Sequence, residues 1–146
     1  MQAPMSVAIQ EAQKACERGE VPVGAVIVRK GQVIVAEGNR TKALHDPTAH
    51  AEVLAIRQAC QILENDRLTD CDLYVTLEPC ALCAAAISFA RIRRLYFGAY
   101  DPKGGAVDHG PCFFQQPTCH HAPEVYGGEN ERVCVEILKE FFEERR

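Results

Sequence analysis

The segment LYVTLEPCALCAAAISFARIRRLYFG, which spans residues 73–98, decides the fold of this chain. Its first five residues are apolar except for Thr76, which is typical of a central strand covered on both faces. Residues 81–91 predict a helix, and the apolar run 95–98 predicts another strand. A strand, a helix and a strand joined by short links predict a parallel βαβ crossover and therefore a layered α/β fold.

The residues at the start of the chain predict a helix and a hairpin. Apolar residues recur at helical spacing over residues 5–16, and Gly19 marks the end of that helix. The apolar runs 23–28 and 33–36 flank a Lys30-Gly31 turn. These two runs are therefore expected to pair as an antiparallel β-hairpin.

Three further elements are predicted from their boundary residues. Asp46-Pro47 has the pattern of a helix N-cap followed by proline, so a second helix is expected to begin there. Its expected buried stripe is Ala51, Leu54, Ala55, Ile62 and Leu63. Residues 101–123 are rich in Gly, Pro and polar residues and predict a long loop, followed by a short edge strand at 124–126. The last helix is expected from about Asn130, with a buried face of Cys134, Ile137, Leu138 and Phe141.

Composition places the chain among globular proteins and predicts one domain over residues 1–146, with 47% apolar and 25% charged residues. A net charge of −4 excludes a polycationic coat protein but not a local nucleic-acid-binding patch. The most apolar stretch, 81–90, is much shorter than the ~20 residues of a membrane span, and no signal peptide is visible. We therefore expect a cytoplasmic protein with no membrane partner. Eight cysteines then indicate metal ligands or core residues, and we assign to the core Cys16, Cys60, Cys71 and Cys134.

The clearest chemical signal combines His50 with the Cys-x-x-Cys pair Cys80 and Cys83. Two cysteines at this spacing at the start of a helix lie one turn apart on the same side, so they can share one ion. The helix N-terminus favours the thiolates that a metal needs. Three protein ligands leave the fourth tetrahedral position for water, which is typical of a catalytic zinc site. The alternative is a surface histidine with a redox or core cysteine pair, and His-x-Glu upstream favours the metal site.

Glu52 is the expected proton carrier beside this metal, because activated water needs a base and the leaving group an acid. Residues i and i+2 on a regular helix point roughly 200° apart. We therefore expect His50 and Glu52 to converge only at the tip of their helix.

These residues form the pattern H-x-E…P-C-x-x-C, the known signature of zinc-dependent nucleoside deaminases. The sequence resembles the bacterial tRNA-specific adenosine deaminases of that superfamily from the first helix to the C-terminus. The motifs that carry the resemblance include EVPVGA at 20–25, HDPTAHAE at 45–52 and YVTLEPC at 74–80.

The resemblance implies a three-layer α/β/α fold of cytidine-deaminase type, with a mixed five-stranded sheet, and a homodimer. It implies hydrolytic conversion of adenosine to inosine at the wobble position of a tRNA anticodon loop. In that reaction zinc-activated water attacks C6, and Glu52 carries the protons. The resemblance assigns one zinc ion per subunit to His50, Cys80 and Cys83. The residues that it matches to substrate contacts are Asn39, Asp101, Lys103, Phe142 and Arg145.

The region 106–128 departs from the commonest pattern of the family. Loop packing is favoured there over a second metal site, whose candidate ligands are His109, Cys112, Cys119, His120 and His121. Arg40 and Lys42 are candidate RNA contacts, whereas the cluster Arg91, Arg93 and Arg94 has a dimer contact as its alternative.

Two other functions stay open from the sequence. One is a zinc deaminase of a free base or small nucleoside, of guanine or cytidine type, because related enzymes share the metal motif. The other is a non-catalytic zinc-bearing RNA-binding subunit, which Glu52 argues against because a structural site needs no acid.

Overall fold

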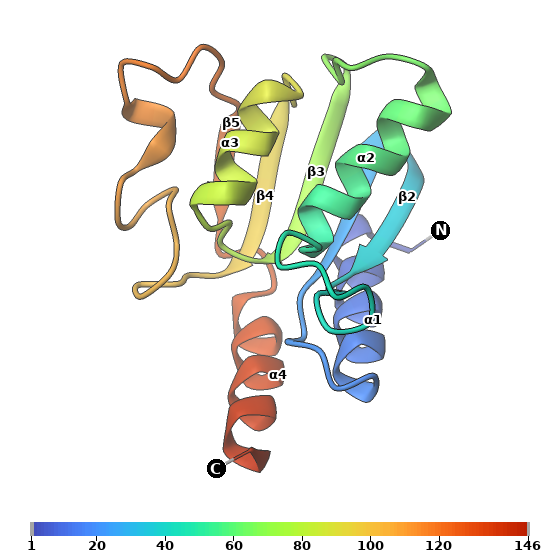
Figure 1. The fold of residues 1–146 in the computed structure, drawn as a ribbon, viewed down its shortest axis with the longest axis vertical. Helices are drawn as coiled ribbons and strands as arrows, with labels where there is room; N and C mark the ends of the chain where they lie inside the picture. Colours follow the sequence, from blue (N-terminus) through green and yellow to red (C-terminus); the bar gives the residue numbers. More distant parts are fainter. Residues whose placement is uncertain (1, 146) are drawn as a thin grey trace.

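The computed structural model describes residues 2–145 and contains one five-stranded sheet with helices on both faces (Figure 1). The helices are α1 (Pro4–Glu17), α2 (Ala51–Leu63), α3 (Ala81–Phe89) and α4 (Glu131–Glu144), with a 3-10 turn η1 (Phe113–Gln115). The strands are β1 (Gly24–Arg29), β2 (Gln32–Gly38), β3 (Cys71–Leu77), β4 (Arg94–Ala99) and β5 (Glu124–Gly127). Within the described residues, no helix has the length and apolarity needed to cross a bilayer.

The strand order is β2-β1-β3-β4-β5, and the sheet is mixed as expected. β1 pairs antiparallel with both β2 and β3, whereas β3, β4 and β5 are parallel. Lys30 and Gly31 both have positive φ, which matches the twist that a two-residue hairpin needs. The β3–α3–β4 crossover confirms the βαβ prediction from residues 73–98, with β3 as the central strand.

The helices divide into two layers, which confirms the three-layer α/β/α fold. α2 and α3 pack on one face of the sheet around Leu73, Val75 and Phe97. α1 and α4 pack on the other face, where Met5, Val26 and Cys134 lie in one apolar cluster. Figure 1 shows α2 and α3 in front of the strands and α4 extending past the lower end of the sheet.

The start of the second helix differs from the prediction. α2 begins at Ala51 with His50 as N-cap, not at Asp46-Pro47. The Asp46 side chain instead accepts hydrogen bonds from the Thr48 backbone N–H (2.8 Å) and hydroxyl (2.7 Å), closing a local turn. The same short side chain can cap a turn or a helix, and here it caps the turn.

Some burial predictions were also wrong. Ile62 is 58% exposed and Leu54 is half-buried, because the buried face of α2 runs instead through Glu52, Val53, Ile56 and Ala59. Of the four cysteines assigned to the core, Cys71 and Cys134 are buried, Cys60 is half-buried and packs against the core, and Cys16 is half-buried on α1. On α4, Cys134 and Phe141 are buried as predicted, whereas Ile137 and Leu138 are half-buried and pack against the same apolar cluster as Cys134.

Candidate metal centre

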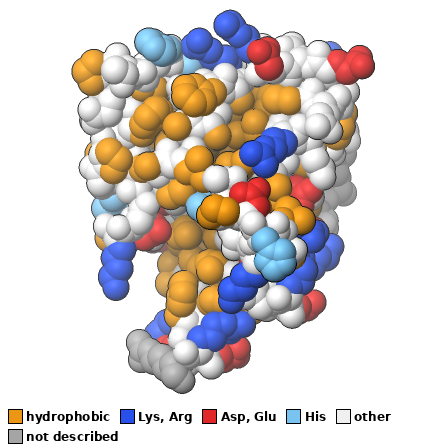
Figure 2. Space-filling model, in the orientation of Figure 1, with side chains coloured by type: hydrophobic (Ala, Val, Ile, Leu, Met, Phe, Trp, Pro, Cys, Tyr) orange, Lys and Arg blue, Asp and Glu red, His pale blue; other side chains and the backbone are white. Residues whose placement is uncertain are grey.

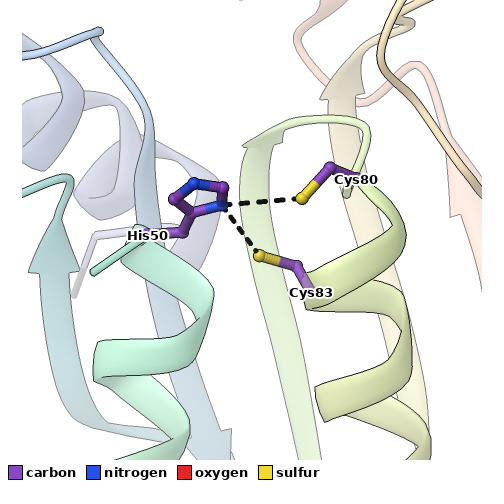
Figure 3. Close-up of side chains that lie close together, drawn as sticks. All are labelled: His50, Cys80 and Cys83. Atoms are coloured by element: carbon purple, nitrogen blue, oxygen red, sulfur yellow. Dashed lines mark hydrogen bonds between the residues drawn. The ribbon is translucent and has the colours of Figure 1, made fainter. Parts of the chain in front are cut away.

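The starts of α2 and α3 bring three metal-ligating side chains together (Figure 3). His50 and Cys80 are the N-caps of the two helices, both with extended backbone, and Cys83 follows in the first turn of α3. The Nδ1 atom of His50 lies 3.5 Å from the Cys80 Sγ and 3.4 Å from the Cys83 Sγ. All three ligand atoms lie within 4.8 Å of one another, as donors to a single ion must.

The chemistry of the three donors fits zinc. The pKa of Cys80 is lowered to about 4, mainly because the Cys83 thiol donates a hydrogen bond to it and also because His50 lies beside it. The pKa of Cys83 is raised by that same hydrogen bond and by burial. A divalent cation that binds both sulfurs displaces the thiol proton of Cys83. Two thiolates and one imidazole are typical zinc ligands. Together they fill three of the four tetrahedral positions and leave the fourth open.

Glu52 lies beside this donor set and is only 4% exposed. Burial raises its pKa to about 7, so the carboxyl group can both take up and release a proton near neutral pH. His50 precedes the helix with φ −74° and ψ 151°, so its side chain is out of phase with the helical positions that follow. This backbone geometry explains how His50 and Glu52 converge at the helix tip.

A cavity of about 260 Å³ is lined by His50, Glu52 and Cys80 together with Asn39 and Asp101. The Asn39 side chain is nearly buried, and its Oδ1 accepts the Ala51 N–H at 2.8 Å, which leaves its NH₂ group as a donor. Asn39 and Asp101 are thus two of the predicted substrate contacts that lie at the candidate site.

A larger groove of about 940 Å³ adjoins this cavity and shares four lining residues with it, Val21, Leu77, Asp101 and Gly104. The predicted contacts Lys103 and Phe142 line this groove, and the Phe142 ring is 54% exposed. Arg145 does not line it. Its guanidinium lies 3.6 Å from the centre of the Phe141 ring and donates to the Phe141 carbonyl oxygen.

Two residues of the groove with polar side chains, Tyr100 and Lys139, were not identified as site residues from the sequence. Lys139 lies three residues before Phe142 on α4, so helical spacing alone places the two on one face. Tyr100 follows the end of β4 directly, where loops of parallel sheets commonly carry binding residues.

The basic cluster and the divergent loop have internal partners. Arg93 forms a two-point contact with Asp72, Arg94 lies 3.5 Å from Glu124, and Arg91 donates to the His120 carbonyl oxygen. In residues 2–145 the only grouping of three or more potential metal ligands is His50, Cys80 and Cys83. Loop packing in the region 106–128, in preference to a second metal site, stays a prediction.

The fold and this donor set define a zinc-dependent deaminase. Residues 1–99 match the cytidine and deoxycytidylate deaminase zinc-binding region, and the chain belongs to this family. The tRNA-specific adenosine deaminase of Agrobacterium fabrum is 63% identical over 142 residues, which cover 97% of this chain and 93% of that protein.

Solved structures support the same family assignment. One, from a study of A-to-I editing by tRNA:A34 deaminases at the wobble position, has a TM-score of 0.92 at 63% identity and covers 92% of this chain and 98% of that one. A guanine deaminase from Bacillus subtilis has a TM-score of 0.67 at 31% identity, covering 99% of this chain and 94% of that one. The family resemblance inferred from the sequence is confirmed.

Proposed function

We propose that this protein is a tRNA-specific adenosine deaminase that converts adenosine to inosine at the wobble position of an anticodon loop. The observation that carries the proposal is the continuity between the cavity of His50, Glu52 and Cys80 and the much larger groove beside it. A free base would need only the cavity, whereas nucleotides flanking a base in a loop need the groove. The similarity to the tRNA-specific relatives supports the same substrate.

In the proposed reaction, His50, Cys80 and Cys83 hold one zinc ion. The bound ion would supply Lewis-acid activation of a water molecule. Glu52 accepts one proton from the water and delivers it to N1 of adenine as the oxygen adds to C6. It then takes the second proton from the new C6 hydroxyl and passes it to the amine, which leaves as the C6–N bond breaks. One water is consumed and one ammonia released, and Glu52 ends in its starting protonation state. Asn39 lines the cavity, and because its Oδ1 accepts the Ala51 N–H, its NH₂ group is available to donate to a ring nitrogen of the purine.

The groove offers the contacts that an unpaired RNA loop needs. Lys103 and Lys139 place positive charge along it, and the exposed Phe142 ring offers a surface on which a base can stack. Such local charge is needed because the whole chain is acidic, with a net charge of −4. We extend the proposal to Asp101, which lines both the cavity and the groove, and to Arg145 at the end of α4.

The test compares substrates for the zinc-loaded protein. We expect inosine in an anticodon stem-loop that carries a wobble adenosine, with little or no product from free adenosine, cytidine or guanine. Liquid chromatography of the digested products measures each yield. If the protein formed xanthine from guanine and left the stem-loop unchanged, it would be a guanine deaminase, and the proposal would be wrong. No product from any substrate, in a protein that holds its zinc, would favour a binding subunit.

We also propose that one deaminase domain forms a homodimer in the cytoplasm, where its tRNA substrate is found. The support for the dimer is an apolar depression of about 470 Å³ between α2 and α3, lined by Val53, Ile56, Leu82 and Phe89. The Phe89 side chain is 76% exposed, far more than the side chain of a core residue. Figure 2 shows hydrophobic side chains gathered on the face that α2 and α3 present. A second copy, placed across a two-fold axis, would cover this patch.

Phe89→Glu is expected to convert the dimer to a monomer, because it places a charge within the apolar patch. Light scattering coupled to gel filtration measures the mass. Val33→Glu, a change at another exposed apolar residue (39% exposed) on the edge strand β2, is the control and should stay dimeric. If the Phe89→Glu protein stayed dimeric, the face formed by α2 and α3 would not be the dimer interface.

A further inference from the structure

Two buried glutamates, Glu20 and Glu78, are neither metal ligands nor used by the proposed chemistry, and Glu78 itself lines part of the cavity. They are 1% and 2% exposed. A buried carboxylate is costly unless its oxygens are hydrogen-bonded, so the partners of each side chain show what it does. In both cases the partners are mainly backbone N–H groups of a loop.

Glu78 gathers the loop that follows β4. Its Oε1 accepts the Asp101 N–H at 2.9 Å and lies 2.8 Å from His109 Nδ1. Its Oε2 accepts the Val107 N–H at 3.2 Å and the Asp108 N–H at 2.9 Å. One carboxylate therefore binds both ends of the segment 101–109.

The same loop packs so closely on Glu78 that Gly105 has no room for a side chain. A Cβ atom there would lie 2.5 Å from the Glu78 carboxyl group and 2.5 Å from the Asp101 carbonyl oxygen. The segment that Glu78 holds includes Asp101, which lines the cavity, and Lys103, which lines the groove. Glu78 thus fixes one wall of the substrate site.

Glu20 performs the corresponding role for the loop that follows β2. Its Oε1 accepts the Lys42 N–H at 3.1 Å and the Thr41 hydroxyl at 3.3 Å, and its Oε2 accepts the Ala43 N–H at 2.9 Å. Thr41 lines the cavity, as does Asn39 two residues earlier. This loop forms a second wall of the same site.

We infer that Glu20 and Glu78 are positioning residues that hold the two substrate-contacting loops in place, independently of the metal ligands. The inference rests on the proposed function, because it takes the cavity and groove to bind the substrate. An ionised carboxylate can only accept hydrogen bonds, so it can satisfy several N–H donors at once. A glutamine has the same size but turns an NH₂ group toward donors, which repels one side of the loop.

The experiment measures zinc content, kcat and KM on the anticodon stem-loop for Glu78→Gln and Glu20→Gln. We expect each variant to keep its zinc and to raise KM about tenfold while kcat changes by less than about threefold, the pattern of lost substrate binding. Glu129→Gln is the matched control. The Glu129 carboxylate has a buried oxygen without a hydrogen-bond partner in residues 2–145 and does not line the cavity or the groove, so its KM should not change.

Other outcomes overturn the inference. If the wild-type protein turns over the stem-loop and both variants keep its KM, the two carboxylates do not position substrate. Loss of zinc in the variants would assign the two carboxylates to the metal centre instead.

Gly105→Ala covers the case in which Glu78→Gln fails to fold, because the added methyl displaces the loop but leaves the carboxylate intact. It is expected to raise KM similarly, and an unchanged KM would again refute the role. A wild-type protein inactive on the stem-loop would refute the proposed function itself.

Discussion

Glu52→Gln is expected to lower kcat on the anticodon stem-loop by about 10²–10⁴-fold, the usual contribution of a positioned acid-base group. Glutamine fills the same space in the cavity beside His50 and Cys80 but cannot carry a proton. The attacking water then loses its base, and the leaving amine loses its acid. Single-turnover assays with saturating enzyme measure the chemical step directly.

Two further measurements separate this proton-carrying role from a structural one. Zinc content is expected to stay at one ion per subunit, because the His50, Cys80 and Cys83 donors are unchanged. Stability should not fall, since burial raises the pKa of Glu52 to about 7 and a neutral amide costs less to bury than a carboxylate. A Glu52→Gln protein that retained a tenth or more of the wild-type kcat would show that another group moves the protons.

Much of the fold was predictable because its strongest signals are local. The segment 73–98 encodes a strand, a helix and a strand in order, and the handedness rule leaves few ways to arrange them. The hairpin around Lys30-Gly31 is equally local, since the turn fixes the pairing. The Cys-x-x-Cys pair needs only the spacing of one helical turn.

The misassigned start of α2 shows where local signals fail. Asp46-Pro47 is a good helix start by residue type, yet the Asp46 side chain binds Thr48 and the helix begins at Ala51. The difference has a chemical consequence. Only with His50 outside the helix can its ring reach the two sulfurs while Glu52 reaches the same cavity.

Glu20 and Glu78 were not identified as site residues because of the nature of their partners. Their hydrogen bonds come chiefly from backbone N–H groups far along the chain, such as those of Lys42 and Asp108. Every residue except proline offers such a donor, so no residue type or spacing marks the contact. The guanidinium of Arg145, which the resemblance matches to a substrate contact, stacks on Phe141, and its contact with RNA stays a proposal.

Removal of one sulfur from the metal centre is expected to abolish activity altogether. In Cys83→Ala, His50 and Cys80 remain as two donors, too few to hold the ion at a tetrahedral site with one open position. We expect zinc per subunit to fall from about one to near zero, as measured by atomic emission after dialysis. The inosine yield should fall below detection.

The matched control for this loss is Cys71→Ala. Cys71 and Cys83 are both buried at 0% exposure and both are free, so each change removes one buried sulfur from the core. A chelator should lower the melting temperature of wild type and of Cys71→Ala, since a ligand at 100 times its Kd stabilises the folded state by about 2.7 kcal/mol. It should leave Cys83→Ala unchanged, because that protein has no ion to lose. Full zinc in Cys83→Ala would mean that the donors at the starts of α2 and α3 lie together for packing and not for a metal.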